Sequence, residues 1–337
     1  MINFIQFTLT RAFLSVVTLL IVCFIVFSLM ELVPGTCAER YLAFKNTQGS
    51  QITFEDIAAE EKRLGLDKPF LYRYAKWVSD IVVKGDFGDS CILRISINEL
   101  LSGRFVLSLT IAITALLFSY AIAIPVGIIS ATTKYASLDN ALKFISYLGI
   151  ALPNFLVALC IMLFMTVYYG DTMTGLFSQE YENAPWSSAK FQDFLSRAWL
   201  PIFVLGWNAT AFALQTVRAL MLDENDKLYV MAARARGVSG MSLLWRYPAK
   251  HSLGPVINSI GFDLNRIFSA LPVVALILIL TEAGALLIEA LARSNDQQLA
   301  GAIIFLLTAT IVFVNFVTDI ILAIMDPRIR KGVMGGS

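Results

Sequence analysis

Charge is scarce in this sequence. Only 15% of its 337 residues are Asp, Glu, Lys or Arg, whereas 57% are hydrophobic and the mean hydropathy is +0.71. A soluble chain of this length would need much more polar surface, so the composition predicts a membrane protein. The 26 Lys and Arg residues nearly balance the 25 Asp and Glu residues. A chain so close to neutral gives no electrostatic argument for a nucleic-acid partner.

Catalytic and metal-binding motifs are missing as well. The single histidine, His251, rules out the two-histidine zinc motif H-E-x-x-H, and its place beside Lys250 at the edge of an apolar run predicts an interfacial polar residue. The sequence contains no G-x-x-x-x-G-K-[ST] phosphate loop and no G-x-S-x-G nucleophile motif. We therefore expect no catalytic residue, metal or cofactor in this chain, and a membrane enzyme is a poor interpretation.

Cysteine is also rare. Of the four cysteines, Cys23 and Cys160 fall inside apolar runs, where they serve as small apolar residues. Cys37 and Cys91 lie near the two ends of a polar segment, and an oxidising compartment would permit a disulfide between them. The sequence leaves a disulfide and two free thiols as equal alternatives.

Long apolar runs are what the chain has in abundance. Since a span needs about 20 mostly apolar residues, we count six of them. The first run is too long for a signal-peptide core and lacks a small-residue cleavage site, so we expect it to be an uncleaved span. No run alternates with period two, which disfavours a barrel and predicts an all-α membrane protein with six transmembrane helices. The six runs cover residues 12–33, 104–132, 142–169, 198–220, 256–281 and 299–325.

The basic residues predict the orientation. Lys and Arg flank the start of the first span, the short loop between spans two and three, the loop between spans four and five, and the end of span six. The loop at 170–197 is instead rich in acidic residues. By the positive-inside rule, both termini lie in the cytoplasm. The expected divisions are 1–33 (N-terminus and first span), 34–100 (periplasmic insertion), 101–325 (core with a cytoplasmic loop at 221–255) and 326–337 (cytoplasmic tail).

The polar segment 34–100 is predicted to fold. Thr53 and Asp56 form a capping box before a helix at 57–64, which Gly65 would end. A second helix would start at the Asp-Lys-Pro sequence ending at Pro69, with one apolar face made of Leu71, Tyr74, Ala75 and Val78. Two amphipathic helices on the outer surface are equally consistent with a solvated decoration and with a docking surface for an external partner.

The loop between spans four and five is too long for a simple turn and contains "YVMAARARGV", residues 229–238. Acidic residues 223–226 would cap a helix over 228–236. Gly237 would break it, and Ser239 or Ser242 would cap a second helix through Trp245 and Tyr247. Either this unit enters a cleft of a partner, with small alanines and basic arginines at the contact, or it lies on the membrane with its arginines at lipid phosphates.

A resemblance decides between these alternatives. The stretch "YVMAARARGVSGMSLLWRYPAKHSLGPV" resembles the cytoplasmic loop of binding-protein-dependent ABC transporter permeases, and is most similar to the peptide/nickel subfamily that includes oligopeptide and dipeptide permease B. Four other stretches resemble that family in the same order along the chain: "GDFGDS", "SLTIAITALLFSYAIAIPVGIISA", "SLDNALKFISYLGIALPNF" and "DPRIRKG". The matching loop residues are Tyr229, Val230, Ala233, Arg234, Ala235, Arg236, Gly237 and Pro255.

This resemblance implies a function and a set of partners. The chain would be one permease subunit, of the type I importer fold, in a bacterial inner membrane. It would work with a second permease, two cytoplasmic ATPase subunits that hold ATP and Mg²⁺, and a periplasmic binding protein. The implied substrate is a di- or oligopeptide, with nickel chelates or oligosaccharides as alternatives. The loop would be the coupling helix that docks on an ATPase, through Tyr229, Ala232, Ala233, Arg234, Arg236 and Gly237. The implied contacts to the binding protein are Tyr72, Asp86 and Phe87.

Two interpretations from other classes compete with this one. An ATP-independent carrier or channel would be expected to have inverted repeats with broken helices, which the sequence does not indicate. A membrane scaffold would leave the glycine-broken basic loop unexplained. The chain also departs from the family pattern in three places: Met231 replaces the signature glutamate, Thr36 and Cys37 replace an Asp and a Pro, and "TEAGALLIEAL" lacks a Gly-Leu-Pro-Gly turn.

Two ionisable residues are predicted to lie inside the fifth span. The uncharged run 267–280 has 14 residues and would measure only roughly 21 Å as a helix, short of a hydrocarbon core of about 30 Å. The helix must extend back, which brings Asp263 and Arg266 to membrane depth, three residues apart and able to pair. We expect them, with Asn154, to face the translocation pathway. The alternative is that Arg266 reaches the interface while Asp263 stays in water.

Overall fold

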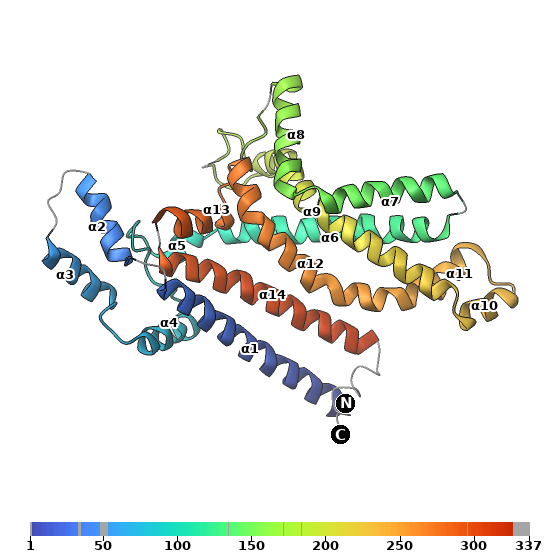
Figure 1. Cartoon of the computed structure of the whole chain (residues 1–337), viewed down its shortest axis with the longest axis horizontal. Coiled ribbons are helices and arrows are strands. Elements are labelled where there is room, and N and C mark those ends of the chain that lie inside the picture. Colours follow the sequence, from blue (N-terminus) through green and yellow to red (C-terminus); the bar gives the residue numbers. More distant parts are fainter. Residues whose placement is uncertain are drawn as a thin grey trace. The chain divides into compact units, whose positions relative to one another are not determined.

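The computed structural model describes residues 2–32, 35–47, 53–133, 135–170, 172–182, 184–294 and 296–325, and Figure 1 shows its helices. The predicted tail 326–337 lies outside these residues. The chain forms two compact units. We call Met1–Phe13, Leu109–Leu280 and Phe313–Ser337 the core unit, and Leu14–Ser108 with Thr281–Val312 the insert unit.

Among the described residues, five helices are long and apolar enough to cross a membrane: Phe4–Leu29, Ile97–Thr132, Ser188–Asn225, Pro248–Leu278 and Gln297–Ile324. They belong to α1 (Ile2–Glu31), α5 with α6 (Ile97–Leu101 and Arg104–Thr132), α9 (Ser188–Asn225), α12 (Pro248–Leu278) and α14 (Gln297–Met325). These spans confirm five of the six apolar runs as long helices.

The third predicted span, 142–169, is not one continuous helix. It consists of α7 (Ala136–Ala151) and α8 (Asn154–Tyr169), which meet at a bend of 102° that is visible in Figure 1. The expectation that no span would be broken was therefore wrong. Pro153 causes the break because it lacks an N–H and pushes the preceding residue out of the helical region. Leu152 accordingly has an extended backbone, with φ −86° and ψ 122°.

In the core unit, α9 packs along α12 and also contacts α7 and α8. Small residues allow the helices to approach closely, as is common in membranes. A Cβ atom added at Gly149 would lie 2.8 Å from the Cβ of Ala211, and one at Gly127 would lie 2.8 Å from Val217. The loop between the fourth and fifth spans forms α10 (Leu228–Ala235) and α11 (Gly240–Arg246), which lie together at one end of α9 and α12 in Figure 1.

The insert unit contains more helix than predicted. Besides α3 (Phe54–Leu64) and α4 (Phe70–Lys84), it has α2 (Cys37–Thr47), α13 (Ala283–Ile288) and the π-helix η1 (Glu289–Ser294). The capping box at Thr53 and Asp56 is present, and Gly65 ends α3 with φ +70°. Both local predictions are confirmed because each depends only on neighbouring residues.

The buried face of α4 differs from the prediction. Phe70, Tyr74 and Trp77 pack against aromatic residues of α1, whereas Leu71 is 66% exposed. The aromatic stripe at i, i+4 and i+7 is therefore half-buried, since large rings remove more apolar area from water. Of the predicted face, Tyr74 and Val78 are half-buried, whereas Leu71 and Ala75 are exposed. The loop after α12, which the missing Gly-Leu-Pro-Gly turn left undefined, is ordered by Glu282. This buried carboxylate caps α13 by accepting from the backbone N–H groups of Gly284 and Ala285.

Candidate functional site

The loop between the fourth and fifth spans is a two-helix unit with its own small core. Val230, Ala233 and Leu243 are buried together, and Tyr247 packs against them. Gly237 joins the helices in the left-handed region at φ +86°, and a Cβ added there would meet nothing within 4 Å. The predicted glycine break is confirmed.

The exposed surface of this loop is basic and apolar. Ala232, Arg234 and Arg236 are exposed, and Met231 is 47% exposed. Ala233 is different: it is fully buried against α11 within this chain. It therefore supports the shape of the loop and offers no surface to a partner, contrary to the expectation that both alanines would form the contact.

Side-chain contacts attach the loop to the long helices. The Tyr229 hydroxyl donates to the carboxylate of Glu224, and its ring centroid lies 5.0 Å from that of His251 on α12. Burial, followed by that hydrogen bond, raises the pKa of the Tyr229 phenol, so it stays protonated as a donor. The predicted acidic cap at 223–226 is wrong, because α9 continues through Asn225 and the residue before α10 is Lys227. The loop is thus a direct continuation of α9.

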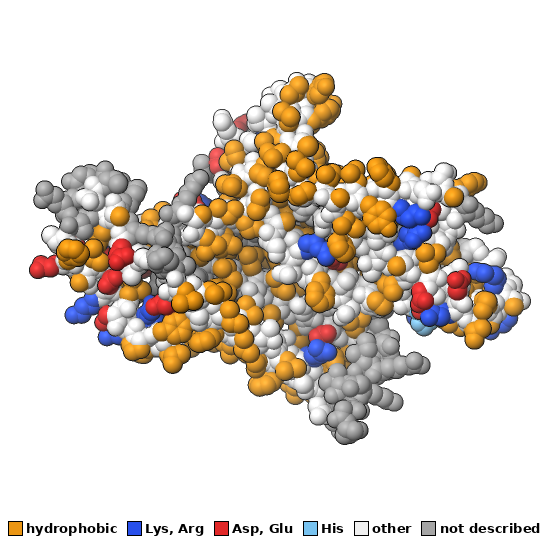
Figure 2. Space-filling view, viewed as in Figure 1, with side chains coloured by type: hydrophobic (Ala, Val, Ile, Leu, Met, Phe, Trp, Pro, Cys, Tyr) orange, Lys and Arg blue, Asp and Glu red, His pale blue; other side chains and the backbone are white. Residues whose placement is uncertain are grey.

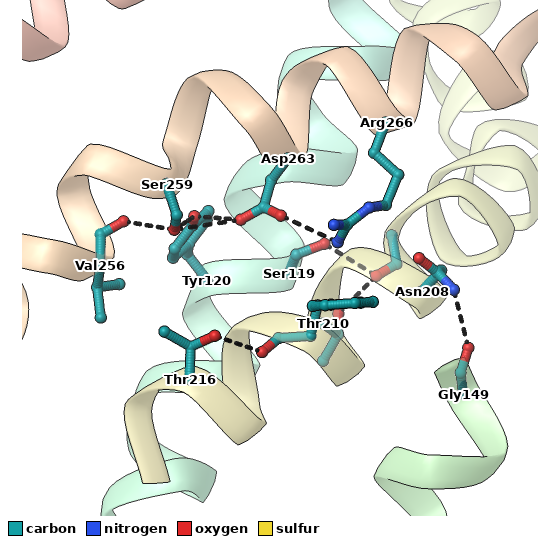
Figure 3. A network of polar contacts seen from close by, with 12 residues as sticks. Ser119, Tyr120, Gly149, Asn208, Thr210, Thr216, Val256, Ser259, Asp263 and Arg266 are labelled. Atoms are coloured by element: carbon teal, nitrogen blue, oxygen red, sulfur yellow. Dashed lines mark hydrogen bonds and ion pairs between the residues drawn. The ribbon is translucent and has the colours of Figure 1, made fainter. Parts of the chain in front are cut away.

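A buried polar cluster lies in the core unit where α12 faces α6 and α9 (Figure 3). We define the Asp263 cluster as Tyr120, Ser259, Asp263 and Arg266. Asp263 is 4% exposed, accepts a hydrogen bond from the Tyr120 hydroxyl at 2.5 Å, and forms an ion pair with Arg266 at 3.2 Å. The Arg266 guanidinium lies 3.8 Å from the ring centroid of Phe212.

The cluster agrees with the predicted Asp263–Arg266 pair and disagrees with the alternative in which Asp263 stays in water. Its charges are compensated by hydrogen bonds and by an aromatic face, as buried ionisable groups require. Asn154, which was predicted for the same pathway, begins α8 at the bend of the third span. Its side-chain oxygen is buried and has no hydrogen-bond partner in the described chain, so the structure does not link it to the Asp263 cluster.

Sequence reasoning missed a second polar cluster. Asp139 on α7 accepts from Arg218 on α9 through two nitrogens, at 2.8 and 2.9 Å. It also accepts from Ser130 on α6 at 2.6 Å and pairs with Lys143 at 3.0 Å. We call these four residues the Asp139 clasp. Arg218 inside an apolar run was a usable signal, because an arginine at that position needs a partner. The sequence analysis used it only to assign orientation.

The three residues predicted to contact a binding protein line one cleft in the insert unit. The cleft has a volume of about 490 Å³ and includes Tyr72, Asp86 and Phe87 in its walls. Tyr72 is 57% exposed, and Phe87 is partly buried against Phe305. Figure 2 shows charged side chains gathered over α3 and α4, which form part of this cleft, and over α10 and α11, while hydrophobic side chains cover much of the long helices.

Cys37 and Cys91 form a disulfide bond in the insert unit, with their Cα atoms 6.2 Å apart. The bond connects the start of α2 to the loop that follows α4. Asp296, which is 1% exposed, binds that loop from the other side by accepting from the Ser90 hydroxyl at 2.5 Å. The loop 86–96, which forms one wall of the cleft, is therefore held by a disulfide at Cys91 and by a hydrogen bond at the adjacent Ser90.

Comparison with known proteins identifies the family. The family described as "Binding-protein-dependent transport system inner membrane component" matches residues 123–331, and its N-terminal counterpart matches residues 4–95. The chain belongs to this family. It is therefore the inner-membrane component of a binding-protein-dependent transport system.

Relatives match along almost the whole chain. The oligopeptide transport system permease protein AppB of Bacillus subtilis is 28% identical over 325 residues, covering 96% of this chain and 99% of AppB. The dipeptide transport system permease protein DppB of Escherichia coli K12 is 26% identical and covers 96% and 98%. The inner membrane ABC transporter permease protein YejB of Escherichia coli O157:H7 is 30% identical over 281 residues, covering 82% of this chain and 76% of YejB.

The fold has a solved counterpart. A chain of the MetNI methionine ABC transporter, in inward-facing conformations, superposes with a TM-score of 0.54 at 16% identity, and covers 67% of this chain and 96% of that chain. The permease thus has the type I ABC importer fold that the resemblance implied.

Proposed function

We propose that this permease is one membrane subunit of an ATP-driven importer of di- and oligopeptides. The observation that carries the proposal is end-to-end similarity to permeases named for oligopeptide and dipeptide transport. Nickel chelates and oligosaccharides remain alternative cargoes for the same machinery.

The proposed partners follow from what this chain lacks. Six spans would form half of a pathway, so a second, homologous permease would complete it. Without a phosphate loop in this sequence, ATP hydrolysis is assigned to two separate cytoplasmic ATPase subunits. A periplasmic binding protein would deliver the peptide, and contact with Tyr72, Asp86 and Phe87 is proposed. The positive-inside distribution supports cytoplasmic termini for this arrangement.

In the proposed cycle, the exposed face of α10 sits in a cleft of an ATPase. ATP binding can change the state of the pathway only if it favours one conformation over the other. Because α10 continues from α9 and contacts α12 through His251, displacement of the loop would move both helices. The Asp139 clasp would carry that movement from α9 to α7, which leads to the bend before α8.

The Asp263 cluster is the proposed polar element of the pathway. Arg266 is more exposed than Asp263, with 35% of its side chain accessible compared with 6%. Arg266 could therefore contact a peptide carboxylate while Asp263 keeps its partners Tyr120 and Ser259. Such a group would hold a peptide terminus or gate the inner mouth.

Reconstitution tests the function. The permease would be co-purified with its partners, placed in proteoliposomes, and supplied with binding protein, ATP and Mg²⁺. We expect uptake of a radiolabelled tripeptide that requires ATP hydrolysis, with no uptake of a nickel chelate or a labelled oligosaccharide. Uptake without ATP would instead indicate a carrier, and selective uptake of the chelate or sugar would replace the peptide assignment.

A further inference from the structure

The cleft in the insert unit is built from segments far apart in the sequence. Its walls come from the end of α1, from α3 and α4 with their connection, from residues 86–89, and from the first residues of α14. Its volume of about 490 Å³ falls within the range of sites that enclose a small ligand, about 300–1,000 Å³. A short peptide has a suitable size for it.

The cleft carries cations without ion-pair partners. Among the carboxylates in its walls, Glu31 is paired with Arg73 and Asp80 is paired with Lys84. Lys62 and Lys76 both line the cleft, are exposed, and form no ion pair with any residue that the structure describes. They are therefore available to bind a carboxylate.

Two carboxylates, Asp86 and Asp89, line another wall of the cleft. The Asp86 carboxylate accepts from the Gly88 backbone N–H at 2.8 Å, which leaves most of its acceptor capacity unused. One site thus presents unpaired ammonium groups from α3 and α4 and carboxylates from the loop 86–89, which suits a ligand with charges of both signs.

An aromatic ring forms part of the cleft wall. Trp77 lines the cleft, and its ring is packed by Phe27 at 5.8 Å and by Phe305 at 5.9 Å between centroids. Its indole N–H is buried and has no acceptor in the described chain. Trp77 therefore offers the cleft a fixed apolar wall.

We propose that this cleft binds a short peptide with free termini, before it enters the pathway. Lys62 and Lys76 bind the peptide carboxylate, and Asp86 with Asp89 binds the ammonium group. The site recognises the peptide backbone and termini, so it accepts different side chains. This inference rests on the proposed peptide import and adds a second peptide site, on the permease itself.

Photo-crosslinking tests the site directly. The full chain is placed in lipid nanodiscs without binding protein, and a tripeptide with free termini and a central benzoyl-phenylalanine is the probe. We expect adducts on peptides that contain the cleft walls. Unlabelled trialanine should compete with the probe, and acetyl-trialanine-amide, which lacks both charges, should compete at least about tenfold less well, since each lost charge contact costs severalfold in affinity.

Variants separate the contacts. Lys62→Ala with Lys76→Ala should weaken labelling about fivefold or more. Lys45→Ala removes a charge from α2, outside the cleft, and should label like the unchanged chain. Equal competition by the capped peptide, labelling outside the cleft, or unchanged labelling of the double variant would overturn the proposal.

A transport measurement distinguishes this proposal from the proposed function. If the assembled importer takes up tripeptide but the cleft is not labelled, only the cleft proposal fails. If tripeptide is neither taken up nor bound, peptide import itself fails.

Discussion

Gly237 allows the strongest test of the coupling loop. Its φ of +86° costs an L-amino acid about 1–2 kcal/mol, whatever its side chain. A Cβ at this position meets nothing within 4 Å among the described residues beyond its chain neighbours, so the first atom of a side chain adds no clash there. A loss of assembly that exceeds the loss at a matched glycine would therefore point to a partner that approaches the loop.

A matched position supplies the control. Gly170, at the end of α8, has φ +70° and also has nothing within 4 Å of an added Cβ. Gly237→Trp and Gly170→Trp should therefore lower the free energy of unfolding by similar amounts, about 1–2 kcal/mol. Only Gly237→Trp should obstruct the ATPase, and overpacking of an interface by about 1–3 kcal/mol weakens assembly by about fivefold to roughly a hundredfold.

The assay combines three measurements on each variant: thermal unfolding in detergent, co-purification with the ATPase subunits, and peptide uptake per ATP hydrolysed. We expect Gly237→Trp to lose assembly or coupling, Gly237→Ala to keep most of both, and Gly170→Trp to keep both. Normal assembly and transport by Gly237→Trp, or an equal loss by Gly170→Trp, would refute the assignment of this loop as the ATPase contact.

Three further outcomes are expected. Non-reducing mass spectrometry of native protein should find the Cys37 and Cys91 peptides linked, and reduction should lower the stability of the insert unit by about 2–4 kcal/mol; two alkylated thiols would remove this expectation. A cysteine placed at Asp263 or Arg266 should react with a water-soluble thiol reagent at rates that differ between ATP-bound and nucleotide-free complexes. Constant rates, with full transport by the Asp263→Asn, Arg266→Gln double variant, would leave the pair without a role in the pathway. Asp139→Asn should lower the free energy of unfolding by about 1–3 kcal/mol, because charged hydrogen bonds between helices are lost; an unchanged melting temperature would contradict it.

Features set by neighbouring residues could be predicted. The capping box at Thr53 depends on a residue three positions away, and the breaks at Gly65 and Gly237 depend on the conformational freedom of one glycine. The pairing of Asp263 with Arg266 is also local, since residues three apart share a helix face. The interactions that stabilise these features are made between residues that are close together in the sequence.

Other predictions were wrong because residues distant in the sequence pack against the surface in question. Ala233 appeared available to a partner, but it packs against Leu243 of the following helix. The face of α4 was assigned by apolar period, whereas the rings of α1 pack against Phe70 and Trp77 beside the predicted Tyr74. Pairwise packing of this kind depends on which elements meet, and periodicity within one element cannot supply that information.

The sequence by itself determined that this is a helical membrane protein, where its apolar helices lie, and that a glycine-broken basic loop connects two of them. Composition and local periodicity suffice for these conclusions because burial in lipid requires every backbone polar group to be satisfied within its own helix. Pro153 accounts for a break between α7 and α8, but only the tertiary structure decided its angle of 102° and the contacts among Ser130, Asp139 and Arg218. Arg218 and Asp139 are 79 residues apart, and what brings them together is the packing of three helices, which no local pattern records.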